Sequence, residues 1–303
     1  MIEIRRILCP TDFSDASQHA LDYAVAIAKW YDATLTVLHV SAVQPVYAFG
    51  AAATVLPPAL LSPSARERLL ASMKQTVELE IGSTVPVTTE LIEGYAAASI
   101  LERAETLPSD LIVLGTHGLS GFDRLALGSV TEKVLRKAAC PVLTVPPRMP
   151  DAVPLPSALF RRILCAVDFS ECSMHALTYA LALAQSGNAH LLVLNVLEHL
   201  LADEVLPPPS AALRGYVESV EADRERRLSE AIPETAKAFC TIETRFREGR
   251  AHRAILRTAE EDKSDVIVLG VRGRGAVDRW MFGSTVQQVV RHATCPVLTL
   301  RQV

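Results

Sequence analysis

The sequence has few aromatic residues, few charged residues and no long apolar segment. Aromatic side chains make up 5% and charged side chains 21% of the 303 residues, whereas half of the residues are hydrophobic. This balance supports a packed core and disfavours a disordered chain. A net charge of −4 without polybasic runs disfavours a nucleic-acid surface. The longest apolar stretch, residues 48–61, carries two prolines and is shorter than the roughly 20 residues of a membrane helix, so we expect no membrane partner.

Cysteine and histidine are present, but not in the patterns of metal or redox sites. None of the six cysteines forms a C-x-x-C pair, and none of the eight histidines belongs to an H-x3-H pair. The cysteines lie in or beside apolar runs, which favours buried, reduced thiols. The first residues show no pattern of a secretory leader. These features predict a cytoplasmic protein without a metal site.

The chain contains an internal repeat. The offset between matching residues is 156 early in the chain and 155 near its end, so the two copies differ by one net deletion. A domain duplication explains this pattern. The matching segments are residues 5–9 and 161–165 (RRILC), 12–14 and 168–170 (DFS), and 140–144 and 295–299 (CPVLT).

The two copies are separated by a proline-rich segment. Five prolines between positions 146 and 156 cannot sustain a helix or an interior strand. We therefore predict one domain at residues 1–146, a linker at 147–159 and a second domain at 160–303.

Each copy alternates apolar, β-branched runs with amphipathic segments. This alternation predicts an α/β fold whose parallel sheet is covered by helices on both faces. Right-handed crossovers favour a flavodoxin-like or related doubly wound sheet with strand order 3-2-1-4-5. The first copy has expected strands at 4–9, 34–40, 86–92, 110–114 and 141–145, and expected helices at 15–30, 62–81, 97–107 and 129–139. The second copy repeats this order of strands and helices through residues 191–196, 214–231, 241–247, 251–261, 266–269 and 297–300.

A glycine-rich loop follows the fourth strand of each copy. Both loops fit G-x2-G-x9-G-S, from Gly115 to Ser129 and from Gly270 to Ser284. Glycine lets a backbone approach a polyanion and take positive φ, and the final Gly-Ser opens a helix whose free N–H groups favour phosphate. In a 3-2-1-4-5 sheet this loop meets Asp12, at the end of the first strand, in the ligand crevice. The alternative is that these glycines only end strands and precede helices, and that Asp12 only caps a helix.

These motifs together resemble the universal stress protein family. The segment GSVTEKVLRKAACPVL from Gly128 looks like that family's C-terminal signature, and the resemblance covers both copies. It implies adenine nucleotide alpha hydrolase-like domains that each bind ATP, with or without Mg²⁺. In the first copy the resemblance implies contacts from Pro10, Thr11, Asp12, Val40, Gly115, Thr116, Gly118, Gly128, Ser129, Val130 and Thr131. In the second it implies contacts from Val167, Asp168, Val196, Gly270, Val271, Gly273, Gly283, Ser284 and Thr285.

The two copies are not identical at these positions. Thr11 becomes Val167, His117 becomes Arg272, and Thr131 becomes Val286. We expect both sites to bind, with the first closer to the family pattern, and Arg272 is a candidate to meet phosphate charge. His39 has Asn195 as its counterpart, which argues against a shared catalytic role.

No nucleophile–base pair and no Walker A lysine stand out. The sequence therefore predicts a nucleotide-dependent sensor or regulator in a stress response, not an enzyme. The alternatives are a slow ATPase and a nucleotide-free interaction scaffold; flavin-dependent electron transfer is a weaker rival.

The two copies are expected to associate with each other. Single-domain relatives resemble dimers made through their final strands, so we predict that residues 142–145 and 297–300 join the two copies as an intramolecular pseudo-dimer. A homodimer of whole chains stays open. Segment 43–61 is either a lid or partner surface, or a loop that packs over the adjoining helix.

Overall fold

The computed structural model describes residues 2–47, 55–81, 85–117, 127–147, 160–198, 211–272 and 283–301. We call residues 2–147 half 1 and residues 160–301 half 2. Half 1 comprises β1 (Arg6–Pro10), α1 (Asp15–Tyr31), β2 (Thr34–Ala42), β3 (Gln44–Tyr47), β4 (Val55–Ala59), α2 (Pro63–Ile81), β5 (Val87–Gly94), α3 (Ala96–Thr106), β6 (Leu111–Gly115), α4 (Ser129–Lys137) and β7 (Val142–Val145). Half 2 comprises β8 (Arg162–Ala166), α5 (Glu171–Gly187), β9 (His190–Leu197), α6 (Ala211–Ala231), the 3₁₀ helix η1 (Glu234–Ala238), β10 (Thr241–Glu248), α7 (Ala251–Asp262), β11 (Val266–Gly270), α8 (Ser284–His292) and β12 (Val297–Leu300).

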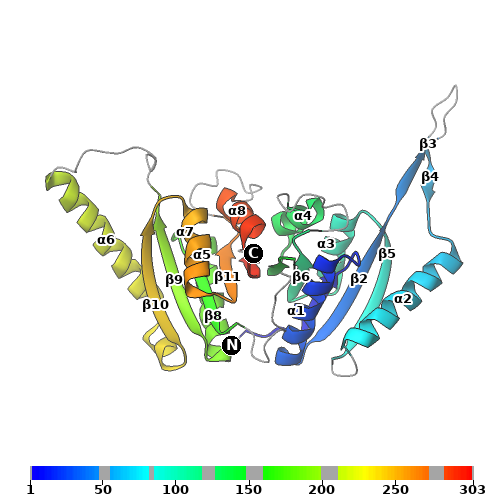
Figure 1. Cartoon of the computed structure of the whole chain (residues 1–303), viewed down its shortest axis with the longest axis horizontal. Helices are drawn as coiled ribbons and strands as arrows, with labels where there is room; N and C mark the ends of the chain where they lie inside the picture. The colour runs from blue at the N-terminus through cyan, green and yellow to red at the C-terminus, as the bar shows by residue number, and fades with distance from the viewer. Residues whose placement is uncertain are drawn as a thin grey trace.

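Ten of these strands form one sheet that runs through both halves (Figure 1). The order is β10-β9-β8-β11-β12-β7-β6-β1-β2-β5. Within each half all neighbouring strands are parallel. Each half therefore has the order 3-2-1-4-5, which confirms the predicted doubly wound fold.

Helices cover both faces of the sheet because the strands are apolar on both faces. In β1, Ile7 and Cys9 face one apolar layer and Leu8 faces the other. The first layer includes buried residues of α1, α2, α5 and α6, and the second includes buried residues of α3, α4, α7 and α8. Continuous burial on two faces is the pattern of parallel sheets in α/β proteins.

The halves meet where β7 pairs antiparallel with β12, as the pseudo-dimer prediction required. The hydroxyl Oγ1 of Thr144 donates to the carbonyl of Val297 over 3.1 Å, and Oγ1 of Thr299 donates to the carbonyl of Val142 over 3.2 Å. Both threonines are fully buried. Each apolar layer includes residues of both halves, so the seam between the halves is part of the core.

The segment expected to be a loop at 43–61 contains a hairpin instead. Strands β3 and β4 pair antiparallel as a separate two-stranded sheet, and Figure 1 shows this hairpin projecting from the end of β2. Proline lacks a donor N–H, so it is tolerated in an edge strand such as β4, which contains Pro57 and Pro58. Among the described residues no helix is long and apolar enough to cross a membrane.

Candidate functional site

The strand order reverses between β1 and β6 in half 1 and between β8 and β11 in half 2. In open α/β sheets, ligands bind outside the carboxyl ends of the strands at such a switch point. Two segments leave this edge in each half. One is the turn that connects β1 to α1, or β8 to α5; the other is the glycine loop after β6, or after β11.

The first segment is an Asp-Phe-Ser turn that initiates a helix. In half 1, Oδ1 of Asp12 accepts hydrogen bonds from the N–H of Ser14 (3.1 Å) and from its hydroxyl (2.6 Å). The hydroxyl of Ser14 in turn caps α1 by accepting from the N–H of Ser17. Phe13 lies in the left-handed region at φ 64°, a strained conformation typical of functional turns.

Half 2 repeats this turn almost atom for atom. Asp168 accepts from the N–H (3.0 Å) and hydroxyl (2.6 Å) of Ser170, and Phe169 has φ 63°. The aspartates thus order the cap residue, whereas Ser14 and Ser170 are the caps. A carboxylate has about four acceptor positions, and in each turn one of its oxygens accepts both of these bonds.

The hydroxyl lost between Thr11 and Val167 has a local replacement. In half 1, Oγ1 of Thr11 accepts from the N–H of Phe13 over 3.1 Å. In half 2, Oγ of Ser173 accepts from the N–H of Asp168 over 3.3 Å. Each turn is therefore held by a hydroxyl, but from a different position in the sequence.

The first glycine of each loop serves close packing. A Cβ atom on Gly115 would lie 2.9 Å from the backbone oxygen of Ala16 in α1, and one on Gly270 would lie 2.6 Å from the backbone carbon of Cys172 in α5. These distances are shorter than real Cβ contacts, so the helix that starts at the Asp-Phe-Ser turn can approach the strand only over glycine. The loop and the turn are thereby brought together.

The last glycine closes the loop. The N–H of Gly128 donates to the carbonyl of Thr116 over 2.9 Å, and the N–H of Gly283 donates to the carbonyl of Val271 over 3.2 Å. Positive φ was the expectation for these glycines, and it is wrong for the four that are described at the strand and helix ends, since among described glycines only Gly249 has positive φ. Gly118 and Gly273 lie outside the described residues.

Glycine also leaves the next helix without a side-chain cap. Gly128 precedes α4 and Gly283 precedes α8, and neither helix has a side-chain cap hydrogen bond, unlike α1 and α5. The first N–H groups of a helix have no intrahelical partner and carry its positive dipole end. Ser129 and Ser284, the first residues of these helices, are exposed. The arrangement can accept an anion at the switch point of each half.

Two predicted contact residues face inward. Oγ1 of Thr131 is buried and donates to the carbonyl of Gly115 over 2.8 Å, so its hydroxyl ties the start of α4 to the end of β6. Val286 occupies the equivalent position and packs in the core of half 2. Thr116 is also buried, and its Oγ1 lies 2.8 Å from Nδ1 of His117.

The remaining predicted residues line the edge of the sheet. Val40 and Val196 are half-buried near the ends of β2 and β9, and Pro10 is half-buried at the end of β1. Val271 is buried, whereas Val130 and Thr285 are half-buried in the first turns of α4 and α8.

Half 2 carries extra positive charge at this edge. The N–H of Val271 donates to the carbonyl of Leu300 over 2.8 Å, which brings Arg272 close to Arg301. Burial, and next the charge of Arg272, lower the pKa of Arg301. Half 1 has His117 at the position of Arg272.

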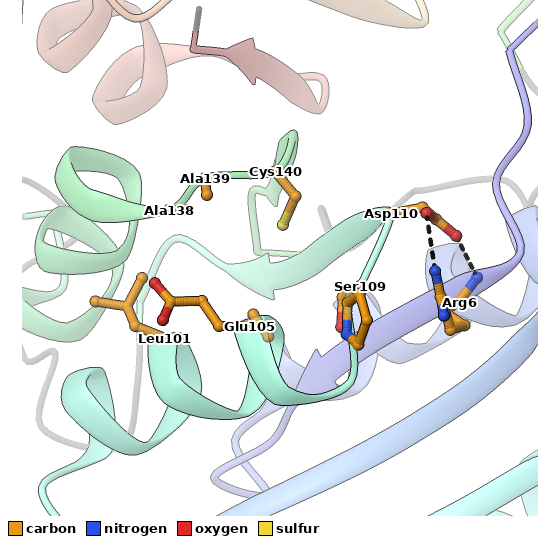
Figure 2. Close-up of a pocket in the computed structure, with 10 residues that line it drawn as sticks. Arg6, Leu101, Glu105, Ser109, Asp110, Ala138, Ala139 and Cys140 are labelled. Carbon is orange, nitrogen blue, oxygen red and sulfur yellow. Dashed lines mark hydrogen bonds and ion pairs between the residues drawn. The ribbon is translucent and has the colours of Figure 1, made fainter. Parts of the chain in front are cut away.

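A cavity of about 300 Å³ lies at the other end of the half 1 strands (Figure 2). Its lining includes Arg6, Leu101, Glu105 and Cys140. Oδ2 of Asp110 accepts from the N–H of Arg6 over 2.8 Å there, and burial raises the pKa of Cys140 to about 11. These groups serve the amino edge of the sheet, away from the switch point. Over the described part of the chain, no cluster of three or more histidine, cysteine or acidic residues could hold a metal.

The sequence did not reveal one buried polar group near the crevice. Asn195 in β9 bonds the carbonyl of Val167, and Arg224 in α6 bonds Asn195. One sequence feature could have pointed to this contact. Both of its residues differ between the halves, because half 1 has His39 and Leu69 at the positions equivalent to Asn195 and Arg224.

Fold and crevice define a tandem doubly wound α/β protein in which each half offers an open helix end beside an Asp-Phe-Ser turn. The universal stress protein family matches the chain twice, over residues 3–146 and 159–301. The chain therefore belongs to the universal stress protein family.

Individual relatives agree with this assignment. A universal stress protein of Mycolicibacterium smegmatis is 26% identical over 298 residues, covering 97% of this chain and 96% of the relative. Universal stress protein MJ0531 of Methanocaldococcus jannaschii is 38% identical over 141 residues, covering 46% of this chain and 81% of the relative. The crystal structure of a universal stress protein from Archaeoglobus fulgidus superposes with a TM-score of 0.67 at 23% identity, covering 99% of this chain and 97% of that one.

Proposed function

We propose that the protein binds ATP in each half and acts as a nucleotide-dependent sensor or regulator in a stress response. The observation that carries this proposal is the repeated meeting of two features at one edge of the sheet. These are the uncapped N-terminus of α4 or α8 and the Asp-Phe-Ser turn before α1 or α5. The helix end suits phosphate, and a carboxylate suits hydroxyl donors such as those of a ribose.

The proposed binding mode divides the ligand between these features. The N–H groups and hydroxyls of Ser129 and Ser284 would hold phosphates, and Asp12 and Asp168 would accept from the adenosine end. A Mg²⁺ ion would arrive with the phosphates, because Mg²⁺ is commonly held by phosphates and a few protein ligands.

A receptor role fits the side chains better than efficient catalysis. The one imidazole described beside the half 1 loop is that of His117, which is hydrogen-bonded to Thr116. Half 2 has Arg272 at the position of His117. A general base shared by the two loops is therefore not available from this position. Slow hydrolysis would show as multiple-turnover phosphate release that disappears in Ser129→Ala.

The test is the nucleotide content of the purified protein. Denaturation followed by mass spectrometry identifies released small molecules and their ratio to the chain. About two adenine nucleotides per chain support the proposal, and one supports a single working site. A chain that carries no nucleotide, even after ATP and Mg²⁺ are added, overturns the proposal and favours an interaction scaffold.

A further inference from the structure

Half 2 supports its Asp-Phe-Ser turn through a chain of buried polar contacts that begins in α6. Nε of Arg224 donates to Oδ1 of Asn195 over 2.5 Å, and a second guanidinium nitrogen lies 3.3 Å from the backbone oxygen of Asn195. Nδ2 of Asn195 then donates to the carbonyl of Val167 over 2.6 Å. Val167 directly precedes Asp168, so this series of contacts ends one residue before the carboxylate proposed to receive the ligand.

These contacts are unusual because they place a guanidinium in the interior. Arg224 is 7% exposed and Asn195 is 4% exposed. Arginine is almost never this buried unless its donors are used. The guanidinium also lies over the ring of Phe246, 5.2 Å from the centroid.

A second arginine of α6 acts on the same turn. The guanidinium of Arg227 lies 4.1 Å from the ring centroid of Phe169, the residue held at φ 63°. A cation over an aromatic face is attracted to it. The helix therefore contacts the turn at two points, one through Asn195 and one through Phe169.

In half 1 the equivalent carbonyl, that of Thr11, is contacted by a histidine without an arginine behind it. Nδ1 of His39, the counterpart of Asn195, lies 2.8 Å from the carbonyl of Thr11, and its ring packs 4.7 Å from that of Phe13. Arg224 corresponds to Leu69 at the offset of 155 that aligns the buried residues Met73 with Leu228. The larger histidine and the leucine have thus been exchanged together for asparagine and arginine.

We propose that Arg224 is a positioning residue of the second nucleotide site. It fixes the amide of Asn195, which holds the backbone before Asp168, and so sets the carboxylate for the adenosine end of the ligand. The inference rests on the proposed function of the crevice. Half 1 depends on His39 for the same task, so the two sites differ in what orders them.

The test compares Arg224→Leu with the double variant Asn195→His/Arg224→Leu, which installs the half 1 pair in half 2. Photolabelling with 8-azido-ATP over a range of concentrations, followed by mass spectrometry of peptides from each half, reports the affinity of each site separately. Site 1 in the same chain is the internal control, and thermal unfolding reports global stability.

In Arg224→Leu we expect the affinity of site 2 to fall at least tenfold, with site 1 unchanged. Without the guanidinium, the amide of Asn195 loses the donor that fixes it, and the backbone before Asp168 is held less firmly. A tenfold loss corresponds to about 1.4 kcal/mol of binding free energy. The double variant should recover most of the loss at site 2. An unchanged affinity of site 2 in Arg224→Leu, with or without a lower melting temperature, would show packing alone and overturn the inference. A wild-type chain that labels at site 1 but not at site 2 would overturn the proposed function of half 2, and this inference with it.

Discussion

At the scale of single residues, the glycines of the two loops perform separate tasks that the motif does not distinguish. Gly115 and Gly270 admit the backbone of a neighbouring helix, whereas Gly128 and Gly283 close the loop and leave a helix end open. The motif spacing is therefore fixed partly by packing. A substitution at each type of glycine should separate stability from binding.

We predict that Gly270→Ala lowers the free energy of unfolding by roughly 2–3 kcal/mol, as expected for overpacking. Its added carbon would lie 2.6 Å from the backbone of Cys172, and a backbone cannot move aside as a side chain can. Gly283→Ala is the control, because its φ of −61° suits alanine and its nearest neighbour is 3.2 Å away. Urea denaturation measures the free energy of unfolding of both variants. Equal stabilities of the two variants would contradict the packing role.

At the scale of elements, the helices and strands followed from sequence periodicity. The apolar strands and the capped helix after Asp12 recur in both copies, so each copy supports the assignment of the other. The hairpin β3–β4 could not be predicted in this way. Pro57 and Pro58 exclude an interior strand but not a two-stranded edge, so the sequence pattern does not reveal the pairing.

The candidate site was predictable where it depends on short motifs. The Asp-Phe-Ser turn and the Gly-Ser helix start are local, and the strand order brings them together. The bond from Thr131 to the carbonyl of Gly115 depends on the register of α4 against β6, which the motif does not specify. The contact of Arg224 with Asn195 depends on the packing of a helix against a strand 29 residues away, which periodicity does not determine.

The open ends of α4 and α8 lead to a prediction in which stability and binding change in opposite directions. In Ser129→Asp a carboxylate occupies the first turn of α4, where the helix dipole favours it by about 0.3–1 kcal/mol. The same carboxylate would repel phosphate, so we expect loss of nucleotide from half 1 at unchanged or higher melting temperature. Ser284→Asp is the matched variant for half 2. Isothermal titration with ATP should give one remaining site in each variant, and two sites in either would contradict the proposed role of that helix end.

At the scale of the whole molecule, partly buried groups that can ionise lie on both sides of the seam between the halves. Tyr179 of α5 belongs to half 2, but its neighbours Tyr31, Asp110 and Cys140 belong to half 1. Burial raises the pKa of Tyr179, and the charges of these neighbours raise it further. Burial also raises the pKa of Tyr31, partly offset by a hydrogen bond with Ser186 across the seam. Every one of these shifts favours the protonated group in the folded protein.

Alkaline pH should therefore weaken the folded state, and the seam in particular. A phenol or thiol whose pKa is raised on folding does not change the free energy of unfolding at pH values below its unfolded pKa. Above that pKa the unfolded chain releases a proton that the folded chain retains, so the free energy of unfolding falls. Burial raises the pKa of Cys140 from 9.0 to about 11 and that of Cys295 from 9.0 to about 12. At pH 10.5 each thiol should lower the free energy of unfolding by roughly 1–2 kcal/mol, since a shift of one pKa unit corresponds to about 1.4 kcal/mol.

Urea denaturation at pH 8 and pH 10.5 measures the change in the free energy of unfolding. Tyr179→Phe removes one titrating phenol from both states and should show a smaller decrease than the wild-type chain. A stability that stays level or rises over this interval would mean that water reaches the seam and ionises these groups in the folded protein.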